Sequence, residues 1–275
     1  MQKNILQITM FLSALELVGY NIAYDGNDAE LSYETSWGKE RFFKEDYIKY
    51  FPYYKKWVED YSKIDVSTIN VKSLPYPYCK LSEIKNFNPF GMYFNGEYVK
   101  RLFDANSIKT AVEIGSYYGV STRHIASLLP ENSKLYAIDT WEYFEGQYEQ
   151  FLSNMVISGL ASKVIPMKQR SDNAVKFFNQ FNKTFDFIYV DGDHETEGVV
   201  SDLENYYPLL TQIGVICGDD WLLRSVRAAV EQFAQKYDLT IYADCNFWFL
   251  KKEECGYCYK SFLNADDSDW MFGNK

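Results

Sequence analysis

The sequence has few of the side chains that build zinc and thiol sites. Its 275 residues include only two histidines, His124 and His194, and five scattered cysteines. The pair Cys255-Gly-Tyr-Cys258 has C-x-x-C spacing, but a zinc site would need a second such pair or histidine partners. The motif also follows the last expected strand instead of opening a helix, as redox motifs do. We therefore predict reduced thiols, as in a cytoplasmic protein, and at most a local role for this pair.

The sequence also lacks basic runs and any long apolar segment. It has 28 Lys and Arg against 38 Asp and Glu, and its net charge is −10. This excess of acidic groups argues against nucleic-acid and anionic-membrane partners and suits a soluble protein that acts on small molecules. Residues 5–20 are apolar, but Gln7 and Glu16 interrupt them and the stretch is too short to span a membrane. We predict a buried or dimer-forming element there, and the second alternative implies a homo-oligomer.

Aromatic residues, in contrast, are abundant. They make up 18% of the chain, with 24 Tyr and 20 Phe, which indicates either a general compositional bias or an aromatic-lined pocket. Residues 1–100 are irregular in pattern, whereas apolar runs alternate regularly with helical patterns from residue 109 onward. We predict an N-terminal extension over 1–100 that contacts substrate or a second copy, a main domain over 101–255 and a tail over 256–275.

Seven short apolar runs in the main domain predict β-strands. Longer segments with apolar residues at helical spacing, such as 121–129, 196–210 and 224–237, lie between most of them. This alternation indicates an α/β fold with a mostly parallel sheet and helices on both faces. The last two runs are too close for a helical crossover, so we expect the last strand to be antiparallel. The seven runs are 111–115, 135–139, 163–167, 185–191, 213–219, 239–243 and 246–251.

The motif 112-VEIGSYYGVST-122 predicts a strand, a turn and a helix start. Gly115 and Gly119 allow the backbone to approach a ligand closely, and the following helix presents free N–H groups. The spacing is G-x-x-x-G instead of the dinucleotide pattern G-x-G-x-x-G, and Glu113 lies at the strand end. That carboxylate would repel a pyrophosphate but not a cationic ligand with a ribose.

Two further strand ends carry polar residues. Asp139 ends the second strand, 20 residues beyond Gly119, where an acidic residue usually binds ribose hydroxyls; helix capping is the alternative. After the third strand, Ser171 or Asp172 is placed to cap the next helix or to accept a hydrogen bond from an adenine amino group. Both roles stay open for these two residues.

Carboxylates end the strands in 188-IYVDGDH-194 and 215-VICGDDW-221. Asp191 precedes the pair Asp219 and Asp220 by 28 residues, enough for a helix and a returning strand, so all three should meet at the carboxyl edge of the sheet. Such a cluster repels itself unless a cation or protons neutralise it, and oxygen ligands favour a hard ion such as Mg²⁺. His194, in the same loop, is either a base, a partner that orients a carboxylate, or an ordinary loop residue. We interpret His124 as structural.

Taken together, VEIGSYYGVST, IDTW, DGDH and GDDW resemble the class I S-adenosylmethionine-dependent methyltransferases over residues 109–251. The strand count and the antiparallel last strand match their Rossmann-like fold. DGDH and GDDW at this spacing are most similar to metal-dependent small-molecule O-methyltransferases of the macrocin type and to cephalosporin-hydroxylase-like proteins. The resemblance implies methyl transfer to a hydroxyl of a small polar metabolite, a sugar or a glycan or natural-product precursor.

The resemblance also implies where the cofactor binds. Gly115 and Gly119 would line its methionine and ribose portions, Asp139 would hold the ribose hydroxyls, and Asp172 would lie near the adenine. The full set of expected cofactor-binding residues is Glu113, Gly115, Ser116, Gly119, Asp139, Thr140, Trp141, Ser171, Asp172 and Asp191.

By the same resemblance, Asp191, Asp219 and Asp220 match Mg²⁺ ligands, and His194 or Asp191 would take the proton of the acceptor hydroxyl. A metal-independent methyltransferase of the same fold is one alternative. A nicotinamide-dependent oxidoreductase is another, but it would need a tighter glycine fingerprint and a Tyr-Lys or His-Asp constellation. A scaffold protein that has lost its chemistry is a third, and the intact carboxylate cluster argues against it.

Overall fold

The computed structural model describes residues 21–23, 30–35, 38–43, 61, 63–88, 91 and 93–261. The chain divides into two compact units, residues 1–60 and 61–275. The sequence predicted a boundary near residue 100, so the second unit includes about 40 residues that the pattern assigned to the extension. The apolar segment 5–20 lies outside the described residues, and its role in oligomer contacts stays a prediction.

The first unit contains a small antiparallel sheet with the strand order β1-β2-β3. Its strands are β1 (Asn21–Ala23), β2 (Glu30–Thr35) and β3 (Gly38–Phe43). The second unit opens with three short 3₁₀ helices, η1 (Val66–Thr68), η2 (Val71–Ser73) and η3 (Tyr78–Lys80). Tyr78 is fully buried, and its hydroxyl donates to the carbonyl oxygen of Val164 at 2.9 Å, which anchors this segment to the main sheet.

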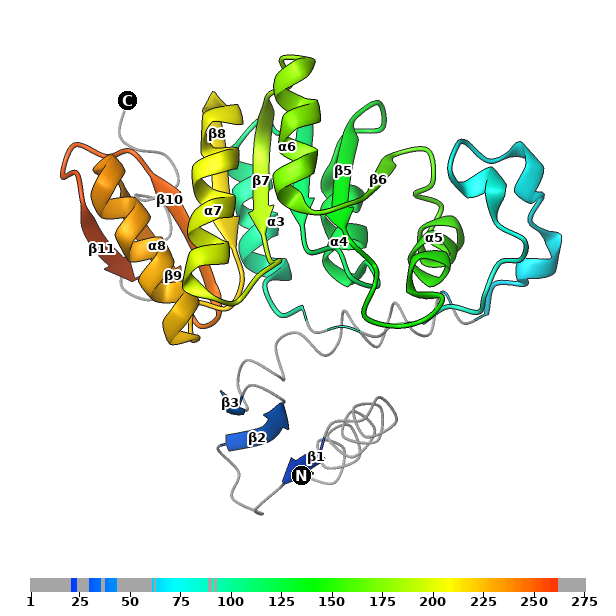
Figure 1. Ribbon diagram of the computed structural model, residues 1–275, viewed down its shortest axis with the longest axis horizontal. Helices are drawn as coiled ribbons and strands as arrows, with labels where there is room; N and C mark the ends of the chain where they lie inside the picture. The colour runs from blue at the N-terminus through cyan, green and yellow to red at the C-terminus, as the bar shows by residue number, and fades with distance from the viewer. Residues whose placement is uncertain are drawn as a thin grey trace. The chain divides into compact units, whose positions relative to one another are not determined.

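An eight-stranded sheet forms the centre of the second unit, in the order β11-β9-β10-β8-β7-β4-β5-β6 (Figure 1). Strands β8, β7, β4, β5 and β6 run parallel, whereas β10 is antiparallel to both β8 and β9. The strands are β4 (Thr110–Ile114), β5 (Lys134–Asp139), β6 (Val164–Lys168), β7 (Phe185–Val190), β8 (Leu210–Gly218), β9 (Thr240–Asp244), β10 (Phe247–Lys251) and β11 (Cys258–Ser261).

The α/β fold and the antiparallel strand are therefore as predicted, but the sheet has one strand more than expected. The eighth strand, β11, pairs in parallel with β9 and falls within the predicted tail 256–275. The sequence did not predict this strand because its four residues, CYKS, do not form an apolar run.

Helices cover both faces of this sheet, with α6, α7 and α8 on one face and α3 and α4 on the other (Figure 1). Helix α8 shows why these segments are helical, since Val226, Val230 and Phe233 recur at helical spacing and are all buried. The helices are α3 (Gly96–Ala105), α4 (Val120–Leu128), α5 (Gln147–Ile157), α6 (Ser171–Gln180), α7 (Thr196–Tyr206) and α8 (Arg224–Tyr237), with a 3₁₀ turn η4 (Tyr207–Leu209) before β8.

The strand order positions the site. Strand β4 lies between β5 and β7. From β4 the chain adds β5 and β6 on one side of the sheet and then β7 and β8 on the other side, so the strand order reverses at β4. Open α/β sheets bind ligands at the carboxyl ends of the strands at such a switch point. The loops after β4, β5, β7 and β8 therefore form the candidate site.

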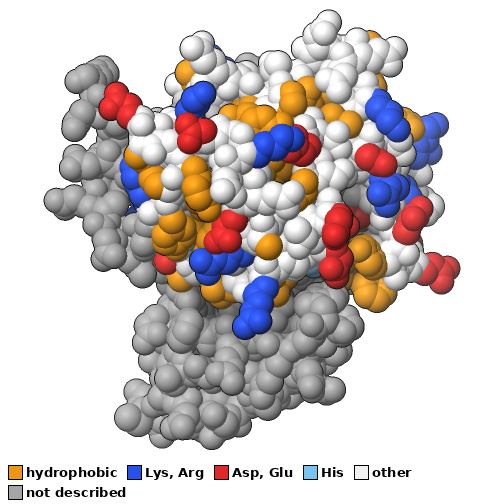
Figure 2. Space-filling model, turned by 60° about the vertical axis from the view of Figure 1, so that its left-hand side comes forward, with side chains coloured by type: hydrophobic (Ala, Val, Ile, Leu, Met, Phe, Trp, Pro, Cys, Tyr) orange, Lys and Arg blue, Asp and Glu red, His pale blue; other side chains and the backbone are white. Residues whose placement is uncertain are grey.

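Among the described residues, no helix is long and apolar enough to cross a membrane. On the face shown in Figure 2, acidic, basic and hydrophobic side chains are interspersed. Exposed aromatic side chains include Tyr143 and Phe144, in the loop after β5.

Candidate active site

The turn between β4 and α4 packs directly on the end of β7. Gly115 and Gly119 have φ angles of +89° and +84°, which favour glycine. A Cβ atom at Gly115 would lie 1.7 Å from the carbonyl oxygen of Asp191, and one at Gly119 would lie 2.4 Å from the side chain of Met155. Both glycines are thus required by the close packing of this turn, and the first of them joins the β4 turn to the β7 loop.

Glu113 is fully buried at the end of β4 and is held by hydroxyl groups. It accepts hydrogen bonds from Ser116 Oγ at 2.7 Å and from Thr122 Oγ1. Burial raises the pKa of Glu113, and the hydroxyl donors Ser116, Ser121 and Thr122 oppose that shift. Its second oxygen, Oε1, is buried and has no hydrogen-bond partner among the described residues. That oxygen therefore has unused acceptor capacity.

Asp139 ends β5 as predicted and connects the β5 loop to the β4 turn. Its Oδ2 accepts from the Tyr117 backbone N–H at 2.8 Å, and its Oδ1 accepts from the Trp141 backbone N–H at 2.7 Å. Burial raises the pKa of Asp139, and backbone hydrogen bonds from Trp141, Tyr117 and Thr140 oppose the shift. Because a carboxylate offers about four acceptor positions, Asp139 keeps acceptor capacity for a ligand.

Ser171 and Asp172 do not cap helix α6. The helix begins at Ser171, and the capping position is occupied by Arg170, which makes no side-chain cap. Ser171 Oγ donates to Asp202 Oδ1 in α7 at 2.6 Å, and Asp172 Oδ1 accepts from Arg170 Nε at 3.3 Å. The capping prediction is wrong because both residues already lie in the first helical turn and have other partners. Their predicted contact with a ligand is not tested by this arrangement.

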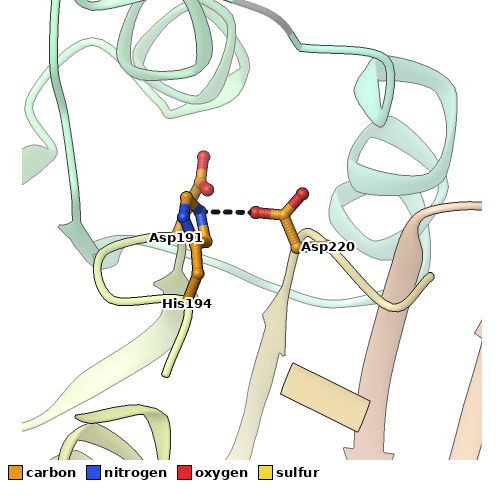
Figure 3. A group of neighbouring side chains, drawn as sticks. All are labelled: Asp191, His194 and Asp220. Atoms are coloured by element: carbon orange, nitrogen blue, oxygen red, sulfur yellow. Dashed lines mark ion pairs between the residues drawn. The ribbon is translucent and has the colours of Figure 1, made fainter. Parts of the chain in front are cut away.

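The loops after β7 and β8 bring together Asp191, His194 and Asp220. One potential ligand atom from each lies within 4.8 Å of the other two. Figure 3 shows Asp191 and His194 on the β7 side and Asp220 facing them from the end of β8. His194 Nε2 lies 2.7 Å from Asp220 Oδ2. The sequence predicted that Asp191, Asp219 and Asp220 would meet and left open whether His194 is a base, a partner of a carboxylate or a loop residue; the structure places His194 with Asp191 and Asp220.

Asp219 lies beside this group, but hydrogen-bond donors within the protein hold its carboxylate. Its Oδ1 accepts from Asn246 Nδ2 and from the Asp220 backbone N–H, both at 2.7 Å, and its Oδ2 accepts from the Tyr189 hydroxyl at 3.5 Å. Asn246 Nδ2 also lies 3.1 Å from Asp220 Oδ1. No motif pointed to Asn246, since only the pairing of β10 with β8 brings the β9–β10 turn to this place.

Burial and mutual repulsion make the carboxylates reluctant to ionise. Burial, followed by the charges of Asp219 and Asp220, raises the pKa of Asp191 well above its ordinary value. Burial and the charge of Asp220 raise the pKa of Asp219 to about 8. A cation near these oxygens would favour their charged forms, so the chemistry of the donor set fits a divalent metal ion.

Tyr189, which contacts Asp219, also contacts further polar and aromatic side chains. Asn95 Nδ2 donates to the Tyr189 hydroxyl at 3.2 Å, and the rings of Tyr93 and Tyr189 pack edge to face with centroids 6.2 Å apart. The Tyr93 hydroxyl lies 2.9 Å from His124 Nδ1. Burial lowers the pKa of His124 to about 4, so this histidine is neutral at pH 7, consistent with the structural role expected for it. No motif in the sequence pointed to Asn95.

Comparisons with known proteins bear on the fold that carries these residues. Residues 112–221 match the family model described as a methyltransferase domain. No curated protein sequence matches the chain. The O-methyltransferase from Bacillus cereus, solved in complex with SAH, has a TM-score of 0.51 at 16% identity, over 61% of this chain and 83% of its own. The O-methyltransferase TomG from Streptomyces achromogenes, involved in tomaymycin synthesis and solved with SAM, has a TM-score of 0.50 at 17% identity, over 62% of this chain and 82% of its own.

At this level of identity, the two structures establish the fold. They support the expected mostly parallel sheet with an antiparallel hairpin at its C-terminal end, and neither is named as a sugar-modifying enzyme. The family match covers the strand ends that carry Gly115, Asp139, Asp191 and Asp220. The family match over residues 112–221 and the shared fold together show that this part of the chain has the Rossmann-like fold of the S-adenosylmethionine-dependent methyltransferases.

Proposed function

We propose that this protein transfers a methyl group from S-adenosylmethionine to a hydroxyl of a small polar metabolite, a sugar or a glycan or natural-product precursor. The observation that carries the proposal is the packing of Gly115 on the backbone of Asp191, which sets the glycine turn against the group Asp191, His194 and Asp220. Groups able to handle a proton thus lie beside the expected methyl donor. The names of the two similar structures support a hydroxyl acceptor, and the DGDH and GDDW resemblance supports a sugar.

The loops after β4, β5 and β6 would bind the cofactor. The buried Oε1 of Glu113 fits the ammonium group of the methionine portion, because that oxygen has acceptor capacity and no partner among the described residues. Asp139 would accept from the ribose hydroxyls, and Asp172 would lie near the adenine. S-adenosylmethionine would supply an activated methyl group on its sulfonium. The remaining proposed contacts are Gly115, Ser116, Gly119, Thr140, Trp141, Ser171 and Asp191.

We infer that Asp191, Asp219 and Asp220 hold a Mg²⁺ ion. When bound, the ion would lower the pKa of a hydroxyl of the acceptor and favour one orientation of it. Asp191 and Asp220 present oxygen atoms to the same space. Asp219 lies beside them, and Asn246 would position both Asp219 and Asp220, because its Nδ2 donates to each of them.

His194 is the residue that we propose as the proton acceptor. Its side chain is 38% exposed, so a substrate hydroxyl can reach it, and Nε2 lies 2.7 Å from Asp220 Oδ2, a contact that would orient the ring. Asp191 lies in the same group and would share the stabilisation of that proton.

Isothermal titration with S-adenosylhomocysteine and then with Mg²⁺ tests the two parts of the proposal in turn. Turnover is followed as S-adenosylhomocysteine release from S-adenosylmethionine with a panel of sugars, nucleotide sugars and catechols. Failure to bind S-adenosylhomocysteine at millimolar concentration would overturn the enzyme proposal. Full turnover in EDTA, or in Asp219→Asn, would overturn the proposed role of the metal and would leave the proposal of methyl transfer intact. Asp193→Asn is the matched control, since it removes a charge from the same loop outside the group of three.

A further inference from the structure

The outer edge of the sheet carries a pair of thiols that the proposed methyl transfer does not use. Cys255 lies in the turn after β10, and Cys258 begins β11, which pairs in parallel with β9. Their Sγ atoms lie 2.8 Å apart. The S–S bond of a disulfide is about 2.05 Å, so bond formation needs a relative movement of the two sulfurs of less than about 1 Å.

The backbone of the turn is fixed by bonds to its surroundings. Thr240 Oγ1 donates to the carbonyl oxygen of Gly256 at 2.8 Å, and the Tyr257 backbone N–H donates to Asp238 Oδ1 at 2.8 Å. Gly256 has a φ of +63°, which glycine adopts without strain. Because Thr240 at the start of β9 and Asp238, two residues before that strand, hold the turn, the two thiols face one another before any bond joins them.

The two thiols differ in reactivity. Cys255 is exposed, and hydrogen bonds from Cys258 and Thr240 lower its pKa, with a smaller contribution from the charge of Lys260. The same contact raises the pKa of Cys258. Cys217, by contrast, is buried in β8, and burial raises the pKa of its thiol. An exposed thiol with a lowered pKa, 2.8 Å from a second thiol, is the arrangement of an attacking and a resolving cysteine.

We propose that Cys255 and Cys258 form a reversible disulfide by exchange with a low-molecular-weight disulfide such as oxidised glutathione. The Cys255 thiolate attacks one sulfur of glutathione disulfide, which forms a mixed disulfide and releases one glutathione thiolate. Cys258 then loses its proton to solvent and attacks Cys255 Sγ, which forms the intramolecular bond and releases the second glutathione thiolate. Both released thiolates take up protons, so the cysteine pair loses two electrons and the oxidant gains them.

The bond would secure the strand that packs against the active-site loop. Tyr259 on β11 stacks on Trp221, with ring centroids 6.0 Å apart and planes inclined by 14°. Trp221 directly follows Asp219 and Asp220 in the chain. Strand β11 has only four residues and pairs with β9, so a covalent link at its first residue restrains it strongly. Oxidation would therefore hold Tyr259 more firmly against Trp221.

The test uses the full chain in glutathione buffers of graded ratio, with acid quenching, alkylation of free thiols and mass spectrometry of the peptide that contains both cysteines. We expect this peptide to lose both thiols together in oxidising buffer and to regain them on reduction. Cys258→Ser should instead retain one glutathione on Cys255, and Cys255→Ser should glutathionylate Cys258 roughly tenfold more slowly. Cys79→Ser, a control at a distant thiol, should leave the exchange unchanged.

Hydrogen exchange gives a second readout, in which β11 amides should exchange roughly tenfold more slowly after oxidation of the wild type and not after the same treatment of Cys255→Ser. The proposal is overturned if both thiols stay reduced in buffers that glutathionylate Cys79, or if Cys258→Ser traps no glutathione on Cys255. Neither result depends on whether the chain binds S-adenosylmethionine or Mg²⁺.

Discussion

The two halves of the site both contain buried carboxylates, but different partners balance the charges. In the loops after β4 and β5, here called the glycine edge, hydroxyl and backbone N–H groups bind Glu113 and Asp139. In the loops after β7 and β8, here called the carboxylate edge, burial and then the charges of neighbouring aspartates raise the pKa of Asp191. Hydrogen bonds from within the protein stabilise a buried carboxylate, whereas carboxylates that face one another repel and are stabilised by a bound cation.

The largest expected effect is at the carboxylate edge. Asp220→Asn removes a proposed metal ligand and the partner of His194, so turnover should fall roughly a hundredfold. In the wild type, Mg²⁺ at one hundred times its Kd should raise the free energy of unfolding by about 2.7 kcal/mol, and the variant should lose most of this gain. Urea unfolding with and without Mg²⁺ measures it. If Mg²⁺ stabilises Asp220→Asn and the wild type equally, the ion binds at a site that does not include Asp220.

Asp202 combines features of the two edges, because it accepts a hydrogen bond from Ser171 and also lies near the charge of Asp193. Burial raises the pKa of Asp202 from 3.8 to about 6. The folded state therefore favours the neutral form of Asp202 more than the unfolded state does. The stabilisation that Asp202 contributes is full below about pH 4 and is lost as the pH rises through 6. Relative to the wild type, Asp202→Asn should gain about 3 kcal/mol of unfolding free energy between pH 4 and pH 8. A pH-independent difference in urea unfolding would contradict the shift.

Asp139→Asn addresses the glycine edge. Loss of the charged acceptor should weaken S-adenosylhomocysteine binding roughly 30-fold, about 2 kcal/mol, because hydrogen bonds to charged groups are the stronger ones. Mg²⁺ binding should be unchanged, and Asp220→Asn should show the reverse pattern. Titration calorimetry of both variants with both ligands measures this. If either substitution weakens both ligands equally, the two edges do not act separately.

The smallest expected effect is on the internal donors themselves. Thr122→Val keeps the shape of the side chain but removes a hydroxyl that donates to buried Glu113, so the free energy of unfolding should fall by about 1–2 kcal/mol. Thr122→Ser retains the hydroxyl and is the matched control. Denaturant unfolding at pH 7 measures the difference, and an unchanged midpoint in the Val variant would show that Glu113 does not need this donor.

Features encoded in contiguous sequence were predictable. Gly115, Asp139 and Asp191 were found because each follows an apolar run whose length and composition indicate a strand, and a strand end fixes where the next residue lies. Consecutive parallel strands then align those ends at one edge of the sheet. The same reasoning predicted correctly that the last strand of the motif region would be antiparallel.

Features that depend on distant partners were not predictable. Ser171 suits a helix cap by its chemistry, but Asp202 in α7 takes its hydroxyl. Asn246 and Asn95 lie in no motif, and they reach the carboxylates only because β10 pairs with β8 and the segment before α3 packs near Tyr189. The short strand β11 is stabilised by pairing with β9 instead of by its own composition.

The sequence by itself determined the α/β alternation, the glycine turn and the presence of carboxylates at successive strand ends, because period and spacing along the chain encode these directly. Only the tertiary structure decided which side chains those carboxylates meet. Glu113 accepts hydrogen bonds from hydroxyl groups, Asp219 accepts one from Asn246, and Asp220 lies against His194. The physical reason is that the ionisation and reactivity of a buried group depend on neighbours within a few ångströms, and the packing of distant segments selects those neighbours.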